Sequence, residues 1–220
     1  MPRTKWWDPT SWRRTSSSLE PTPRKRRTST TRIERGLVDA GGGRTSPVVP
    51  VALALGGNLG SVEQTLGRAL RELEAALGPL RIASLYRSSP LSPVSQPDYL
   101  NTAAVATTAL EPEAVLALAK ALELAAGRRL NVRFGPRPLD IDILLYGDRT
   151  SDAPELTLPH PRLRERRFML EPLAEIAPDW PVPPDGTPVQ DLLACLGTAQ
   201  NLERIGWSHP LATKSADRSP

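Results

Sequence analysis

The sequence has little of what marks several classes of protein. Its 220 residues include a single cysteine, Cys195, which excludes an internal disulfide framework and a cysteine zinc cluster and favours a reducing, intracellular compartment. No stretch approaches the roughly 18 apolar residues of a membrane helix, and the N-terminus lacks the apolar run of a secretory signal. We therefore expect a soluble, cytoplasmic protein that binds no membrane.

The net charge of +4 is unevenly divided along the chain. Residues 1–46 hold 11 Lys and Arg against 4 Asp and Glu, which leaves 17 basic and 20 acidic residues of the chain's 28 and 24 for the remainder. The basic excess therefore belongs to the N-terminal segment. Because a nucleic-acid-binding domain needs a basic face of its own, we expect no nucleic acid partner.

The two ends of the chain have the composition of tails. Residues 1–47 are rich in Arg, Ser, Thr and Pro, and we expect disorder there and in residues 208–220. The basic segment leaves three interpretations open, namely a flexible extension, an organelle transit peptide and a misassigned start codon. One folded domain is expected over residues 48–207.

Apolar periodicity between these tails predicts an α+β domain. The expected strands are 51–55, 80–88, 99–108 and 139–146, and the expected helices are about 62–77, 111–126 and 189–196. Ser61 and Gln64 match a capping box, whereas residues 159–178 are expected to form a loop with short helical turns. The order of elements predicts a ferredoxin-like α/β sandwich with a four-stranded antiparallel sheet core and a C-terminal extension.

The last expected strand alternates carboxylates with aliphatic side chains. Since successive side chains of a strand point to opposite faces, Asp140 and Asp142 are expected on one face, roughly 7 Å apart along the chain. The aliphatic residues between and after them are expected in the core: Ile141, Ile143 and Leu145. Such a carboxylate pair suits Mg²⁺ together with phosphate oxygens. Two ordinary acids on a solvent-facing strand remain the alternative.

Arginines are dense on both sides of this pair. Four arginines precede the pair, namely Arg128, Arg129, Arg133 and Arg137. Four more come after His160, namely Arg162, Arg164, Arg166 and Arg167. Guanidinium groups bind phosphate oxygens through two parallel hydrogen bonds, so we expect an anionic ligand. A general arginine bias is the alternative, because only 4 of the 28 basic residues are lysine. A lone histidine is more often a structural hydrogen-bonding residue than a catalyst.

Four segments in this order resemble the 6-hydroxymethyl-7,8-dihydropterin pyrophosphokinase family: 55–60, 96–101, 135–142 and 158–168. The segment Gly-Pro-Arg-Pro-Leu-Asp-Ile-Asp is the most specific of them, and the resemblance spans roughly residues 50–207. It implies transfer of the β,γ-diphosphate of ATP to the hydroxymethyl group of the pterin, with release of AMP, in folate biosynthesis. ATP and 6-hydroxymethyl-7,8-dihydropterin are then the expected partners of a monomer.

The resemblance also implies roles for particular residues. Two Mg²⁺ ions that bridge the ATP phosphates are expected on Asp140 and Asp142, which with Arg128 and Arg137 form the catalytic set. The residues expected to bind ATP are Glu123, Arg128, Arg133, Arg137, Ile143, Thr157, His160 and Arg166. Those expected to bind the pterin are Gly56, Ser89, Pro90, Leu91, Tyr99, Asn101, Phe134, Asp140 and Phe168.

Two positions depart from the family pattern. Phe134 stands where a tryptophan is typical, which keeps an aromatic face but loses the indole donor, and Leu130 stands where a further arginine is common. Two rival functions fit less well. A metal-dependent nuclease would also use paired aspartates and arginines, and an RNA-binding module shares the ferredoxin-like sheet but needs exposed aromatics on its central strands.

Overall fold

The computed structural model describes residues 47–90, 95–128, 135–197 and 200–207. The two expected tails therefore lie outside the described residues, apart from Pro47. The described residues from Val48 onward belong to one compact unit. Among them, no helix is both long enough and apolar enough to cross a membrane.

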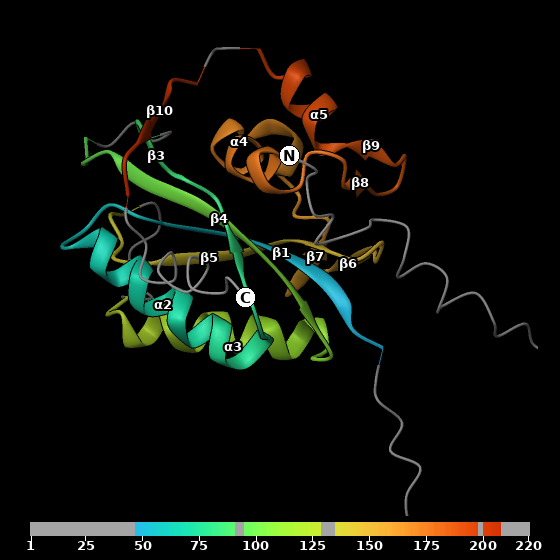
Figure 1. Ribbon diagram of the computed structural model, residues 1–220. Coiled ribbons are helices and arrows are strands. Elements are labelled where there is room, and N and C mark those ends of the chain that lie inside the picture. Colours follow the sequence, from blue (N-terminus) through green and yellow to red (C-terminus); the bar gives the residue numbers. More distant parts are fainter. Residues whose placement is uncertain (1–46, 91–94, 129–134, 198–199, 208–220) are drawn as a thin grey trace, which may run out of the picture. The chain divides into compact units, whose positions relative to one another are not determined.

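One antiparallel sheet organises the unit (Figure 1). Its strands run in the order β10 (Leu202–Ile205), β3 (Leu85–Ser88), β4 (Tyr99–Thr108), β1 (Val49–Gly57) and β5 (Asp140–Tyr146), and β2 (Arg81–Ile82) also pairs with β4. The adjacent strands β3, β4, β1 and β5 are those of the expected ferredoxin-like core, so the predicted fold is confirmed.

The expected strand 80–88 is in fact two strands, β2 and β3. The break falls at Ala83 and Ser84, where the backbone N–H of Ser84 donates to a carboxylate oxygen of Glu175 at 2.9 Å. A backbone donor bound to a side chain cannot also extend the ladder to the neighbouring strand. The periodicity of the segment does not reveal this interruption, because the partner lies far along the chain.

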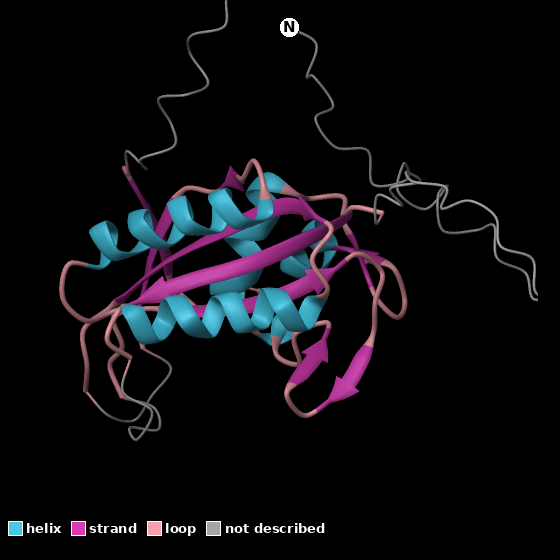
Figure 2. Cartoon of the chain, turned by 90° about the horizontal axis from the view of Figure 1, so that it is seen from below, coloured by secondary structure: helices cyan, strands magenta, loops and turns pink. Residues whose placement is uncertain are grey.

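Helices cover both faces of the sheet (Figure 2). The helices α2 (Val62–Leu77) and α3 (Pro112–Ala125) lie on one face, and α4 (Arg167–Ile176) lies on the other with α5 (Val189–Cys195) packed against it. The main hydrophobic cluster lies under α2 and α3 and includes Leu53, Leu55, Leu66, Leu70 and Leu73. This burial, at about 25 cal/mol per Å² of apolar surface, fixes the orientation of β1.

Two predictions of local structure were wrong. Within the described part of the chain, Ser61 makes no side-chain cap hydrogen bond, and its carbonyl accepts the Thr65 hydroxyl at 3.1 Å instead. The segment 159–178 contains a short 3₁₀ turn, Leu163–Glu165, and the full helix α4. The helix was missed because Pro172 lies inside it, and proline usually indicates a helix end or a loop.

Short hairpins follow β5 and were not predicted. They pair β6 (Ser151–Ala153) with β7 (Leu156–Leu158), and β8 (Pro181–Val182) with β9 (Thr187–Pro188). The second pair precedes α5 and includes Val182, which is fully buried. Strands of two or three residues carry too little alternation to be recognised in a sequence.

Strand β5 follows the expected alternation only in its first half. Asp140 and Asp142 pair with Gly56 and Ala54 of β1, while Ile141 and Ile143 enter the hydrophobic cluster on the opposite face. The register then shifts opposite Ala52 and Leu53, and this β-bulge reverses the faces that follow. Leu145 is buried as expected, but Tyr146 takes the next place in the cluster under α2 and α3.

Candidate functional site

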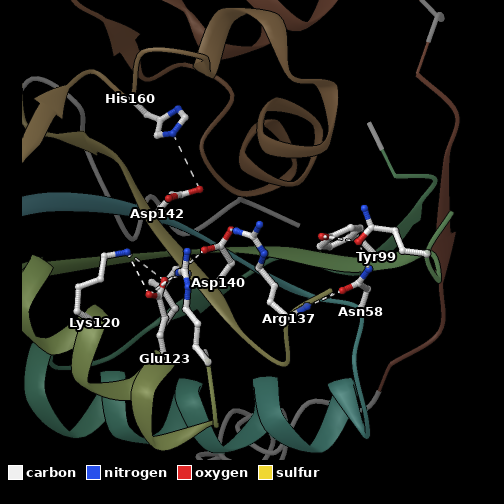
Figure 3. Close-up of polar contacts among 11 residues, drawn as sticks. Asn58, Tyr99, Lys120, Glu123, Arg137, Asp140, Asp142 and His160 are labelled. Atoms are coloured by element: carbon white, nitrogen blue, oxygen red, sulfur yellow. Dashed lines mark hydrogen bonds and ion pairs between the residues drawn. The ribbon is translucent and has the colours of Figure 1, made fainter. Parts of the chain in front are cut away.

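A pocket opens where the ends of β1, β4 and β5 meet the first turn of α4. Its lining combines carboxylates, arginines, an amide and aromatic rings: Ala54, Leu55, Gly56, Ser88, Ser89, Gln96, Tyr99, Asn101, Arg137, Asp140, Asp142, Arg166, Phe168 and Met169. Residues from all four of the resembling segments therefore line one pocket. Figure 3 shows how several of the polar members lie.

The two aspartates lie on one face of β5, as the alternation predicted. Burial raises the pKa of Asp142 to about 6, with the negative charge of Asp140 as the next cause. Lys120 and Arg166 act in the opposite direction. A carboxylate pair that opposes its own ionisation gains from a nearby dication, because the cation favours both charged forms.

Asp140 is held by the two arginines that were predicted to act with it. Arg128 places Nη1 2.6 Å from Oδ1, and Arg137 places Nη1 2.8 Å from Oδ2. Arg128 also lies 2.5 Å from Oε2 of Glu123 and so bridges two carboxylates. Burial lowers the pKa of Arg128 less than the carboxylates raise it, so the guanidinium stays charged.

Glu123 lies outside the pocket lining, on α3, behind Asp140. Its carboxylate is almost fully buried, with 1% of the residue exposed. Oε1 accepts the backbone N–H of Ile141 at 2.8 Å, and Lys120 Nζ lies 3.1 and 3.2 Å from the two oxygens. These contacts compensate a charge that would otherwise be costly to bury. Glu123 thus supports Arg128 and β5 from the side away from the pocket.

His160 faces the aspartates from the loop after β7. Its backbone N–H donates to the Leu144 carbonyl at 2.9 Å, and Nε2 lies 3.9 Å from Oδ2 of Asp142 (Figure 3). Burial lowers the pKa of His160 to about 4, with the charges of Arg166 and Arg162 as further causes. The imidazole is therefore neutral at pH 7, and Nδ1 accepts the backbone N–H of Arg162 at 3.2 Å.

Arg166 is a further cation of the pocket and is half buried. Burial and the neighbouring Arg162 lower its pKa from the usual value, without removing its charge at neutral pH. Its guanidinium lies 5.4 Å from the centre of the Phe168 ring, within the range of a cation–π interaction. The ring and the cation therefore reach the pocket together, from the start of α4.

The other end of the pocket suits a flat polar heterocycle. Asn101 on β4 is buried, and its Nδ2 donates to the Ser88 hydroxyl at 2.9 Å. Gly56 on β1 makes room for that amide, because a Cβ at this position would lie 2.7 Å from Oδ1 of Asn101. Tyr99 and Phe168 add aromatic surface. An amide between aromatic walls is well suited to recognising the polar edge of a ring system.

The predicted site residues do not all reach this pocket. Ser89 lines it, and Pro90 follows directly, whereas Leu91, Arg133 and Phe134 lie outside the described residues, as does Leu130. The Ile143 side chain belongs to the hydrophobic cluster on the opposite face of β5. The Thr157 hydroxyl donates to the Ala153 carbonyl at 3.1 Å within the hairpin of β6 and β7.

Five lining residues were not predicted as site residues, namely Ala54, Leu55, Ser88, Gln96 and Met169. Gln96 stands at the start of a segment that had been recognised, and Met169 follows Phe168 directly, so proximity in the sequence was the available signal. Ser88 had the same signal, because it directly precedes the predicted Ser89, and it pairs with Tyr99 across two strands.

The donor set fits Mg²⁺ only as a shared site. In the part of the chain that the structure describes, no cluster of three or more His, Cys, Asp or Glu could hold a metal ion by itself. Mg²⁺ commonly binds through one or two carboxylates and completes its octahedron with water and substrate phosphates. Asp140 and Asp142, with Arg137 and Arg166 in the same pocket, are such a set.

Comparisons with known proteins confirm the family resemblance of the sequence. Residues 52–178 match the family model described as 7,8-dihydro-6-hydroxymethylpterin-pyrophosphokinase. The chain is 41% identical over 143 residues to the 2-amino-4-hydroxy-6-hydroxymethyldihydropteridine pyrophosphokinase of a Synechocystis species. This match covers 64% of this chain and 73% of the relative. It is 40% identical over 157 residues to the Pseudomonas aeruginosa protein of that name, and this match covers 70% of this chain and 96% of the relative.

Solved structures show the same fold at lower identity. The Plasmodium falciparum HPPK-DHPS structure with pteroate superimposes with a TM-score of 0.56 at 15% identity, covering 67% of this chain and 44% of that one. The chain therefore spans less than half the length of this solved neighbour. At such identity the likeness concerns the fold alone.

Proposed function

Because the chain belongs to the 7,8-dihydro-6-hydroxymethylpterin-pyrophosphokinase family, and so is a pyrophosphokinase of folate biosynthesis, we propose that ATP and Mg²⁺ are its co-substrate and cofactor. The β,γ-diphosphate of ATP passes to the hydroxymethyl group of 6-hydroxymethyl-7,8-dihydropterin, and AMP is released. One observation carries the assignment of the site, namely that the paired aspartates share a pocket with Asn101 and Phe168.

The two ends of the pocket divide the work of binding. Asn101, Tyr99 and Phe168 hold the pterin, so that its hydroxymethyl group points toward β5. Arg137 and Arg166 bind phosphate oxygens through charge-assisted hydrogen bonds. Two Mg²⁺ ions held by Asp140 and Asp142 would neutralise the triphosphate charge. This alignment turns a reaction between two molecules into one between groups already in place.

The chemical step exchanges one P–O bond for another. The hydroxymethyl oxygen forms a bond to the β-phosphorus of ATP. The bond between the β-phosphorus and the oxygen that bridges it to the α-phosphorus breaks, and AMP leaves with that oxygen. Asp140 is the candidate to accept the hydroxyl proton. Because negative charge spreads over the transferred group, the arginines contribute by matching the charge of the transition state.

The ATP-binding residues outside the pocket are assigned by position. Glu123 lies on α3 and Thr157 on β7, and both of these elements contact β5, which carries Ile143. Ile141 directs its N–H outward to Glu123, and the alternation of an antiparallel ladder directs the main chain of Ile143 the same way. We propose that the adenine contacts this outer edge.

One assay tests the proposed function. Incubation of the protein with ATP, Mg²⁺ and 6-hydroxymethyl-7,8-dihydropterin should yield AMP and the pterin diphosphate in equal amounts. Formation of ADP would indicate a simple kinase, and an unchanged nucleotide would indicate a binding module. Omission of Mg²⁺, with a chelator present, should abolish AMP formation. Light scattering tests the expectation of a monomer.

A further inference from the structure

Three segments around the pocket meet at Asn58, the residue that follows β1. On one side, its backbone N–H donates to the Arg137 carbonyl at 2.9 Å, and its Oδ1 accepts the Arg137 N–H at 2.8 Å. The side chain thus pairs with Arg137 as a neighbouring strand would. The pairing requires Gly57, because a Cβ there would lie 2.5 Å from the Pro138 carbonyl oxygen.

The other end of the same amide binds the segment before β4. Nδ2 of Asn58 donates to Oε1 of Gln96 and to the Pro97 carbonyl, both at 3.1 Å. Oε1 of Gln96 also lies 3.4 Å from the Tyr99 hydroxyl, and both residues line the pocket (Figure 3). Asn58 therefore contacts the segment that shapes the pterin end.

Few side chains could replace Asn58 in this position. The residue is 5% exposed, and one amide supplies an acceptor to Arg137 and two donor hydrogens to the opposite segment. Aspartate keeps the acceptor but loses both donors, and leucine keeps much of the volume but loses all three bonds. A buried polar group that loses its partner carries the full cost of desolvation.

We propose that Asn58 is a positioning residue that couples the two ends of the pocket, so that the pterin segment and Arg137 adopt their binding positions together. A chain of contacts runs from Tyr99 and Gln96 through Asn58 to Arg137, whose Nη1 lies 2.8 Å from Asp140. Occupation of either end then favours the other, as thermodynamic linkage requires. The inference rests on the proposed function for the identity of the two ligands.

Asn58→Asp is the most informative variant, because it separates the two halves of the contact. It preserves an acceptor for the Arg137 N–H. Gln96 can rotate its amide to donate to the new carboxylate, but the Pro97 carbonyl cannot change its role and loses its donor. Asn58→Leu removes both halves, and Asn201→Asp, at an exposed position, makes the same chemical change away from the pocket.

The experiment measures the dissociation constant of the pterin by calorimetry, with and without a nonhydrolysable ATP analogue and Mg²⁺. The ratio of the two constants is the coupling factor. We expect the wild type and Asn201→Asp to have the same coupling factor. In Asn58→Asp the coupling factor should fall at least about fivefold, while the pterin affinity without nucleotide should change by less than that. The kcat of Asn58→Asp should fall at least about tenfold.

A merely structural role would give a different result. If Asn58→Asp lowered the melting temperature but kept the coupling factor and kcat within twofold of wild type, the proposal would be wrong. A wild-type coupling factor near one would overturn it as well. Failure of Asn58→Leu to fold leaves the near-isosteric Asn58→Asp to decide. Absence of AMP formation by the wild type would count against the proposed function, whereas the coupling measurement needs no turnover.

Discussion

Arg128 places its guanidinium 2.6 Å from Oδ1 of Asp140, the carboxylate expected to share the bound metal. A cation of the protein therefore already neutralises this carboxylate. The same Nη1 atom lies 2.5 Å from Oε2 of Glu123, so under the proposed function the guanidinium would have to turn partly away from Asp140 to reach phosphate oxygens. Under the proposed function, the metal and the guanidinium thus compete for one carboxylate.

Asp142→Asn should abolish most of the turnover. The amide keeps the shape of the side chain but removes an anionic oxygen from the proposed Mg²⁺ site. At saturating Mg²⁺ we expect AMP formation to fall by well over tenfold, where each tenfold corresponds to about 1.4 kcal/mol of barrier. Asp152→Asn, on the exposed part of β6, is the matched control. Turnover within tenfold of wild type would refute the metal assignment.

Arg128→Lys should also lower kcat, by about tenfold or more. An ammonium group is a compact charge that cannot present the planar fork of a guanidinium to a carboxylate and a phosphate together. Steady-state kinetics with varied ATP measure the effect. Arg71→Lys, on the exposed side of α2, gives the same exchange away from the pocket and should match the wild type. Equal kcat values in both variants would contradict the role of Arg128.

Gly56→Ala should weaken pterin binding while leaving ATP binding largely intact. The added Cβ would lie 2.7 Å from Oδ1 of Asn101 and would displace that amide from the polar edge it recognises. We expect the KM for the pterin to rise at least about tenfold. Gly206→Ala is the control, because a Cβ there meets no heavy atom within 4 Å. A larger effect on the KM for ATP than on that for the pterin would oppose this assignment.

His160 should titrate far below the usual range for a histidine. Burial, with repulsion from Arg166 and Arg162, lowers its pKa from 6.5 to about 4. A lowered pKa stabilises the fold above pH 6.5, and this contribution is lost as the pH falls from 6.5 toward 4. NMR of the ring protons in ligand-free protein measures the pKa, and His209→Gln leaves His160 as the sole histidine of the chain. A pKa near 6.5 would contradict the burial of the His160 imidazole beside the two arginines.

Apolar periodicity along the chain was enough to predict the four core strands of the sheet, the helices α2 and α3 and the placement of Asp140 with Asp142, but not the edge strand β10. The helix α4 escaped prediction because Pro172 lies inside it. The break at Ser84 escaped because its cause, Glu175, is 91 residues away. The contacts of Asn58 could not be predicted from the sequence either, since its partners Gln96 and Arg137 are 38 and 79 residues away. Local sequence patterns predict helices, strands and the faces on which their side chains lie. Contacts between distant loops become visible only in the folded structure.

The carboxylate of Glu123 has a consequence for how molecules of this protein meet one another. Among the described strands, β5 pairs on one side with β1, and its other side is a potential template for a strand from a second molecule. On that side, the carboxylate of Glu123 accepts the hydrogen bond of the Ile141 N–H. An incoming strand would have to displace a buried anion and leave it without that donor, so the same side chain that supports Arg128 also discourages aggregation through this edge.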